Sequence, residues 1–280
     1  MSPASISARF PYAAVLLLIL TSIPLAAAAA AAAAKKEDNG DGKPKDSGTV
    51  WATPHDSYSS SIGVLGCKID TDHVAYWPDA VDCDNICVSL SYAGRTVKLL
   101  RIDQSQGAHD VSYEAWNYLY TGYSATDRPT AGGAVEMEFE NLEPSKCTHL
   151  INTDGGKLPL SAANSMNYLA SCLGQEGGTW VGDNFLLFNV ADSICSIGHD
   201  EECDLDWPDA NQASCPHTLG DNARLEGAPV YNILYPSGER VLASTGEVVE
   251  DDAASPSGLG AAVLVSVLFA SCAVVVPWVI

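Results

Sequence analysis

The 280-residue sequence is poor in basic side chains and contains no Asn-x-Ser/Thr motif. Only 14 Lys and Arg residues stand against 35 Asp and Glu residues, and residues 47–252 carry 9 basic and 31 acidic side chains, a net charge of −22. Nucleic-acid binding depends on clustered Lys and Arg. Nucleic acid is therefore excluded as a partner, anionic lipid headgroups are disfavoured for the same reason, and no N-linked glycan is expected.

Long apolar runs occur only at the two extremes of the chain. Residues 1–20 carry a single charge, Arg9, and an apolar run over 13–20, and an alanine tract with many A-x-A sites follows. This order is typical of a secretory signal peptide. We assign residues 1–30 to it, with cleavage between about Ala26 and Ala34.

Residues 259–280 form the second apolar run, 22 residues without a charge. A run of small residues before such a tail is typical of a GPI-anchor signal. The alternative is a membrane-spanning helix, for which 22 residues suffice, but the Lys or Arg expected after a stop-transfer segment is missing. We therefore expect a spacer over 249–258, removal of 259–280, and lipid attachment at one of five small residues: Ala253, Ala254, Ser255, Ser257 or Gly258.

Eight of the nine cysteines lie outside that tail. An even number behind a signal peptide predicts four disulfides formed in an oxidising compartment, with 105 pairings open. The eight are Cys67, Cys83, Cys87, Cys147, Cys172, Cys195, Cys203 and Cys215, and Cys272 leaves with the tail.

The rest of the chain divides into three segments by composition. Residues 31–60 begin with a stretch rich in Gly and in balanced charge, with nothing to bury, and are predicted to be a flexible linker. Residues 61–150 carry the strongest structural patterns. Residues 151–248 form a cysteine-rich extension that we expect to pack on the preceding domain.

Alternation and turn residues predict strands in the first domain. The runs 87–92 and 96–102 flank the turn Ala93-Gly94 and predict a hairpin. Residues 134–140 alternate so that Val135, Met137 and Phe139 face inward.

Two helices are predicted from cap residues. Ser112 and Gly122 bracket one helix, with Trp116 on its apolar stripe, and Ser161 and Gly174 bracket a second. Further strands are expected at 185–190, 230–235 and 240–243.

Residues 83–147 resemble the double-psi β-barrel superfamily of barwin, expansins, loosenin-like proteins and family 45 endoglucanases. The motifs are Cys83-Asp84-Asn85-Ile86-Cys87-Val88, Leu100-Arg101-Ile102-Asp103-Gln104-Ser105 and Gly107-Ala108-His109-Asp110-Val111-Ser112-Tyr113. The resemblance implies a mainly β fold, a six-stranded double-psi β-barrel with short helices and a cysteine-rich α+β extension. The C-x3-C bracket and Ser105 in place of a cysteine depart from the pattern, so disulfide pairing is not carried over.

The resemblance also implies a site. Asp110 takes the place of the family's catalytic acid, and Asp79 follows Tyr76-Trp77-Pro78 where family 45 endoglucanases have a base. An inverting hydrolase uses two such carboxyl groups. The competing interpretation is that Asp103 and Asp110 only bind backbone amides and hold loops in place.

Aromatic rings near these residues could stack on sugar rings. We expect Tyr76, Trp77 and Tyr113 to be exposed and Trp116 to be in the core. The candidate substrate-binding residues are Asp103, Tyr76, Trp77, Tyr113 and His109.

No cofactor or metal is predicted. The acidic segment 200–209 lacks the glycine and final Glu of a calcium-binding EF-hand loop and is interpreted as a solvated loop. Beside His217, Cys215 is expected to be half of a disulfide rather than a zinc ligand.

Together these observations predict a monomeric fungal-type surface protein, held by a GPI anchor at the outer membrane face or cell wall. It would bind cell-wall polysaccharide, such as β-glucan, cellulose or chitin, without hydrolysis. One alternative is an endo-acting inverting glycoside hydrolase. The other is a non-catalytic structural or host-interaction protein.

Overall fold

The computed structural model describes residues 46–249. The predicted signal peptide, most of the predicted linker, the lipid-attachment residues and the apolar tail lie outside the described residues. Within 46–249, no helix combines the length and apolarity needed to cross a bilayer.

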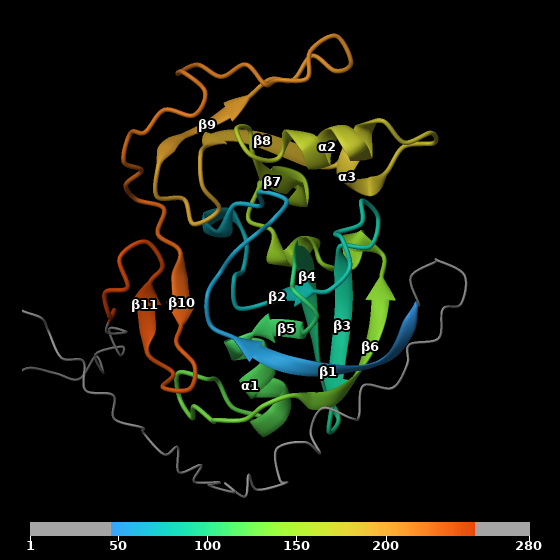
Figure 1. The fold of residues 1–280 in the computed structure, drawn as a ribbon, viewed down its shortest axis with the longest axis vertical. Helices are drawn as coiled ribbons and strands as arrows, with labels where there is room; N and C mark the ends of the chain where they lie inside the picture. The colour runs from blue at the N-terminus through green and yellow to red at the C-terminus, as the bar shows by residue number, and fades with distance from the viewer. Residues whose placement is uncertain (1–45, 250–280) are drawn as a thin grey trace, which may run out of the picture. The chain divides into compact units, whose positions relative to one another are not determined.

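Six strands form a closed barrel (Figure 1) in the order β1-β5-β2-β4-β3-β6, with β1 pairing β6 to close it. Two pairs, β1 with β5 and β2 with β4, are parallel, and the other pairs are antiparallel. The predicted mainly β fold with a six-stranded barrel is confirmed. The strands are β1 Ser47–His55, β2 Val74–Trp77, β3 Cys87–Tyr92, β4 Arg95–Gln104, β5 His109–Ser112 and β6 Val135–Leu142.

The local patterns explain two of these strands directly. In β6, Met137 is buried in the barrel interior while Glu136 and Glu138 are exposed, as the alternation predicts. The β3–β4 hairpin turns at Ala93 and Gly94, both with positive φ (49° and 79°). Positive φ at both positions suits the two-residue turn that matches the twist of paired strands.

Strand β1 lies within residues 31–60, so the predicted linker extends too far. Val50 and Ala52 are buried in the barrel interior, and β1 pairs with β5 on one side and β6 on the other. Without β1 both of those strands would be open edges. The burial of alternate β1 residues, and the pairing that closes the barrel, therefore determine the structure of residues 47–55 more than the polar, Gly-rich composition of the stretch before them does.

Helix α1 covers Tyr113–Thr121, between the two residues predicted to bracket it, and Gly122 ends it in the left-handed conformation at φ 85°. The predicted side-chain cap at Ser112 does not form, because the Ser112 hydroxyl donates to the backbone carbonyl of Asp72. Its buried stripe includes Trp116, which packs in the barrel interior.

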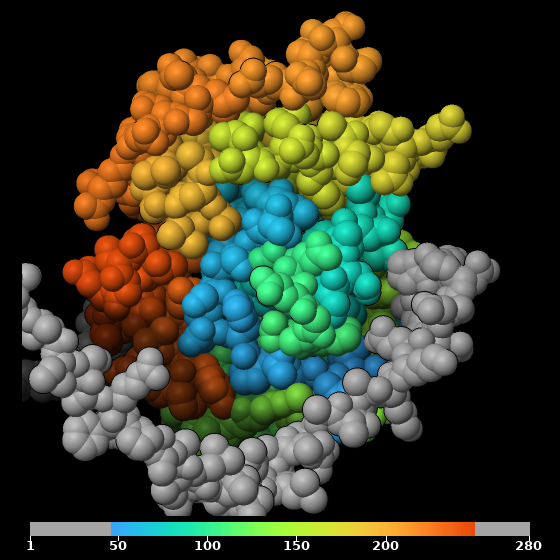
Figure 2. All heavy atoms as spheres, viewed as in Figure 1, coloured from blue at the N-terminus to red at the C-terminus, as the bar shows by residue number. Residues whose placement is uncertain are grey.

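The extension contains a three-stranded sheet, β7-β8-β9, and a separate β10–β11 hairpin. Residues of the extension share one apolar cluster with Val74, Leu100 and Ile102 of the barrel, and Figure 2 shows the extension residues (yellow to orange) against the barrel residues (blue to green). The elements are η1 Gly66–Lys68, η2 Pro144–Lys146, η3 Thr148–Leu150, η4 Asp154–Gly156, β7 Leu158–Ser161, α2 Met166–Leu173, α3 Trp180–Asp183, β8 Phe185–Val190, β9 Gly198–Cys203, β10 Tyr231–Ile233 and β11 Arg240–Leu242.

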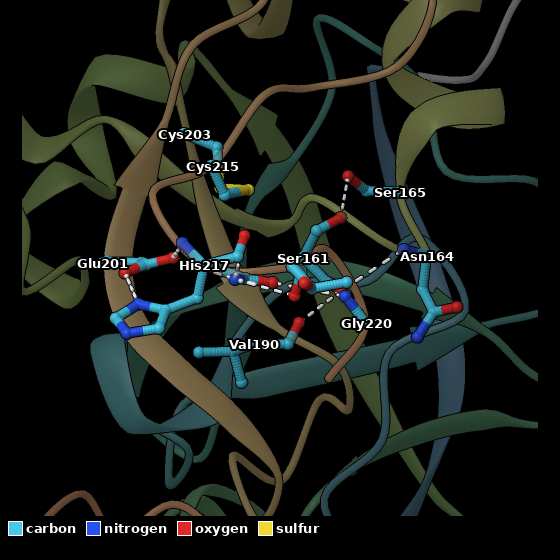
Figure 3. Close-up of a disulfide and its surroundings, with 11 residues drawn as sticks. Ser161, Asn164, Ser165, Val190, Glu201, Cys203, Cys215, His217 and Gly220 are labelled. Atoms are coloured by element: carbon cyan, nitrogen blue, oxygen red, sulfur yellow. Dashed lines mark hydrogen bonds and ion pairs between the residues drawn. A yellow bond between two sulfur atoms is a disulfide. The ribbon is translucent and has the colours of Figure 1, made fainter. Parts of the chain in front are cut away.

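The helix predicted to start at Ser161 starts later. Ser161 is the buried last residue of β7, and its hydroxyl donates to the carbonyl of Val190 at 2.6 Å. Ser165 precedes α2, and its hydroxyl donates to the Ser161 carbonyl at 2.6 Å (Figure 3). Residues 158–161 form strand β7 instead of the start of the helix, because Leu158 and Leu160 are fully buried where β7 pairs with β8. The strands predicted at 185–190, 230–235 and 240–243 are confirmed with shorter bounds for the last two.

All eight cysteines expected to pair are paired, which confirms four disulfides. Two of them join the extension to loops between barrel strands, at Cys67 and Cys83, and so cross-link the two parts. The pairs are Cys67–Cys195, Cys83–Cys172, Cys87–Cys147 and Cys203–Cys215.

Candidate functional site

Strand register brings four of the polar residues together across β1, β5, β2 and β4. Asp110 in β5 is the register partner of Thr53 in β1 and of Tyr76 in β2. Tyr76 is in turn the partner of Asp103 in β4. Pairing between strands that are far apart in the sequence, parallel for β1–β5 and β2–β4 and antiparallel for β2–β5, places these residues side by side.

The half-buried part of this region consists of Thr53, His55 and Asp110, which we call the β1–β5 patch. The Thr53 hydroxyl donates a hydrogen bond to the Asp110 carboxylate. His55 lies two residues after Thr53, on the same face of β1. Its ring packs 4.5 Å from the ring of Tyr76, at an interplanar angle of 51°.

Asp103 serves a different purpose. It is 8% exposed, and its carboxylate accepts hydrogen bonds from the backbone amides of Ser61 (2.8 Å) and Gln104 (2.7 Å) and from the Ser59 hydroxyl (2.5 Å). These bonds tie the segment after β1 to β4. For Asp103 the arrangement follows the competing interpretation, a carboxylate that holds a loop.

The expectation that Tyr76, Trp77 and Tyr113 are exposed is wrong, since their exposed fractions are 4%, 3% and 2%. Trp77 packs edge-on to Phe139 inside the barrel, at 5.2 Å. Rings buried to this degree offer no face to a sugar. Trp116 is in the core as predicted, and its indole N–H donates to the carbonyl of Ala52 at 3.1 Å.

His109 and Asp110 do not join in one site. The His109 ring packs edge-on to Trp77, a residue of the interior cluster, at 5.1 Å. Successive residues of a strand point to opposite faces, and Asp110 faces Thr53. The sequence motif therefore splits between the two faces of β5.

Asp79, the predicted base, lies beyond the end of β2 with an 86% exposed side chain. Its carboxylate is 3.9 Å from Nη2 of Arg101, which also donates to the backbone carbonyls of Asp79 and Ala80 at 3.3 Å each. Burial lowers the pKa of Arg101. Asp79 thus faces solvent and Arg101, whereas the predicted acid, Asp110, faces Thr53.

A small pocket adjoins the patch between the end of β1, the start of α1 and β10. Its volume is about 20 Å³, room for one water molecule rather than a sugar ring. Its lining includes His55, Tyr76, Asp72 and Glu114. Burial, and after it the charges of Asp70 and Glu114, raise the pKa of Asp72 to about 6.

The pKa values of two other groups near the pocket are also shifted. Burial, followed by the charge of Asp103, raises the pKa of Tyr76. Burial would lower the pKa of His73, but its hydrogen bond to Asp70 at 2.8 Å leaves that pKa raised.

The acidic segment 200–209 is only partly a loop, because its first residues belong to β9. There Nδ1 of His217 lies 2.6 Å from Oε2 of Glu201, close to the Cys203–Cys215 disulfide (Figure 3). The predicted disulfide role of Cys215 is confirmed. Among residues 46–249, no group of three or more His, Cys, Asp or Glu side chains is arranged to hold a metal ion.

Sequence reasoning missed Thr53 and His55, because both fell within the predicted linker. The alternation Thr49-Val50-Trp51-Ala52 was the signal that could have identified the strand that carries them.

No protein-family model and no curated protein matches the sequence. Solved structures similar to part of the chain include cerato-platanin 2 from M. perniciosa, at 17% identity and a TM-score of 0.27, with 36% of this chain and 98% of that chain covered. The fungal elicitor cerato-platanin is similar at 16% identity and a TM-score of 0.25, with 34% and 96% covered. The barrel is assigned from its strand pairing and not from these similarities.

Proposed function

We propose that the protein binds neutral cell-wall polysaccharide at the β1–β5 patch, through hydrogen bonds and without cleaving the chain. The observation that carries this proposal is the half-buried pairing of Thr53 with Asp110 on two adjacent parallel strands. The expansin- and barwin-like motifs around Asp110 support the same function by resemblance.

The chemistry of the patch suits a ligand rich in hydroxyl groups. An ionised carboxylate accepts several hydrogen bonds, a Thr hydroxyl donates and accepts, and a His ring can do either. Asp110 and Thr53 are fixed by the barrel, and the His55 ring is fixed against Tyr76. A ligand therefore meets groups whose conformational freedom is already restricted, which reduces the entropic cost of binding.

The proposal includes secretion and a GPI anchor at the cell surface. Four disulfides are typical of proteins that fold in an oxidising compartment. The apolar segments 1–20 and 259–280 are the sequence features that support export and anchoring. Release of the protein from intact cells by a phospholipase specific for phosphatidylinositol tests the anchor, and retention of all the protein after treatment contradicts it.

The test of binding compares the secreted protein with its Asp110→Asn and Thr53→Val variants on cellulose, β-glucan and chitin. Asp127→Asn, an exposed carboxylate in the segment after α1, is the matched control. We expect the first two variants to lose about tenfold in affinity for the polymer that binds, since each loses hydrogen bonds of about 1 kcal/mol or more. The control should bind as the wild type does.

Hydrolysis is measured in the same samples. Release of reducing ends by the wild type that disappears in Asp110→Asn establishes a glycoside hydrolase instead. Absence of binding to all three polymers contradicts the proposal and leaves a structural or interaction protein.

A further inference from the structure

The outer face of β1, β6, β3 and β4 carries a second set of polar groups. Thr49 pairs in register with Glu138, Glu138 with Ser91, and Ser91 with Thr96. One residue from each of four adjacent strands therefore forms a row across the barrel wall, which we call the cross-strand row. Adjacent strands are about 4.8 Å apart, so the row presents a hydrogen-bonding group at each such step.

The row lines a groove of about 490 Å³, bounded at one end by the β3–β4 turn with Tyr92 and Arg95. Ligand sites in proteins are typically of this size, about 300–1,000 Å³. The Ser91 and Thr96 hydroxyls are hydrogen-bonded to each other at 2.8 Å, which fixes their positions.

An exposed indole stands beside the row. Trp51 is 59% exposed and is the register partner of Glu136, which also lines the groove. Trp51 and Thr49 are two residues apart in β1 and share its outer face. Its ring offers an apolar face on which a sugar ring can stack and a π-system that attracts cations.

The charge of the groove is negative. Glu136 and Glu138 are exposed, and neither forms an ion pair with a residue in the described part of the chain. Arg95 also lines the groove and keeps its positive charge, but its guanidinium is held by the backbone carbonyls of Leu119 (2.8 Å) and Tyr120 (3.2 Å). The two glutamates therefore leave the groove with a net negative charge.

We propose that this groove binds an extended, β-linked polysaccharide with free amino groups, lying across the strands. The distance between successive rings of such a chain is close to the spacing of the cross-strand row, so consecutive rings meet consecutive side chains. Where the polysaccharide crosses β6, ammonium groups pair with Glu138 and with Glu136, which lies two residues away on the same strand. The Trp51 ring, the register partner of Glu136, attracts a cation and stacks on a sugar face. An anionic polymer is repelled, and a neutral one lacks the charge interaction.

This groove and the β1–β5 patch share strand β1 but use different residues. None of the patch residues lines the groove, and the groove continues from Thr49 over β6 and β3, whereas Thr53 of the patch pairs with β5 on the other side of β1. Binding here therefore does not depend on the function proposed for Asp110.

The experiment measures binding of a glucosamine hexamer to the secreted protein by calorimetry, beside the N-acetylated hexamer and cellohexaose. We expect the glucosamine hexamer to bind more tightly than both, with an affinity that falls as salt rises because exposed charges are screened. Equal binding of the three hexamers, or no binding of the glucosamine hexamer, overturns the proposal.

Variants locate the site. Glu136→Gln/Glu138→Gln and Trp51→Ala should each weaken glucosamine-hexamer binding about tenfold, through lost charge-assisted hydrogen bonds and lost cation–π contact. Glu176→Gln/Glu226→Gln removes two exposed carboxylates elsewhere and should bind as the wild type does. An equal loss in this control overturns the proposal, because net charge and not the groove then explains binding.

Asp110→Asn separates the two proposals. It should leave glucosamine-hexamer binding unchanged, whatever its effect on neutral polymers. A loss of glucosamine-hexamer binding in Asp110→Asn places the amino polysaccharide at the β1–β5 patch and overturns the assignment to the groove.

Discussion

Replacement of Asp72 by Asn should stabilise the protein at neutral pH. Asp72 lines the small pocket beside α1 and β10, and its pKa is raised to about 6 from an ordinary 3.8. The causes are burial first, then the like charges of Asp70 in the same loop and Glu114 in α1. His73 and Arg240 of β11 act in the opposite direction and leave the pKa raised.

The direction of the stability change follows from the linkage between proton binding and folding. A carboxyl group whose folded pKa is raised prefers the neutral form in the folded state. Below about pH 3.8 it is protonated in both states and contributes no penalty. Between about pH 3.8 and pH 6 the carboxyl group is ionised in the unfolded state but still mostly protonated in the folded state, so the free energy of unfolding falls as the pH rises. Above about pH 6 the full penalty applies. A shift of about two units corresponds to about 3 kcal/mol at pH 7, which is an upper limit because solvent partly reaches the group.

The assay is urea unfolding of wild type and Asp72→Asn at pH 7.5 and pH 3.5, with disulfides intact. We expect the variant to be more stable by about 2 to 3 kcal/mol at pH 7.5 and nearly equal to the wild type at pH 3.5. Asp127→Asn, which removes an exposed carboxylate, should change the free energy of unfolding little at either pH. A variant that is equally or less stable than the wild type at pH 7.5 refutes the reasoning.

Three further changes test the fold. Cys87→Ser/Cys147→Ser removes a disulfide between residues 60 positions apart and should lower the free energy of unfolding by about 4 kcal/mol; an unchanged urea midpoint shows that the disulfide adds nothing to stability. Asp103→Ala removes three hydrogen bonds to the segment after β1 and should cost about 2 to 4 kcal/mol, with faster proteolysis within residues 56–61; resistance equal to the wild type argues against the loop-holding role. Gly132→Ala places a Cβ 2.4 Å from the Trp116 ring and should cost about 1 to 3 kcal/mol by overpacking, read as a lower melting temperature, and a melting temperature at or above that of the wild type contradicts the packing described.

Elements defined by short-range patterns could be predicted from the sequence. The alternation in β6 and the Ala93-Gly94 turn each report a local preference that tertiary packing reinforces. Gly122 did the same for the end of α1, where it adopts the left-handed conformation. At these positions propensity and burial favour the same conformation.

The errors arose where distant pairing decides the conformation. β1 follows a Gly-rich stretch, and it is ordered by pairing with β5 and β6, about 60 and 90 positions further along the chain. Ser161 is a good helix cap, but pairing of β7 with β8 places it in a strand. A single sequence does not show which residues of two strands pair. That pairing also determines that Tyr76 and Trp77 are buried and that Thr53 lies beside Asp110.

The central claim is that the β1–β5 patch binds polysaccharide through Asp110. Binding of the secreted protein to insoluble cellulose, β-glucan and chitin, measured for wild type, Asp110→Asn and the Asp127→Asn control, tests it most directly. We expect one of these polymers to retain the wild type and the control, Asp110→Asn to lose about tenfold in affinity, and no reducing ends to appear. Equal retention of Asp110→Asn and wild type, or no retention of either, contradicts it.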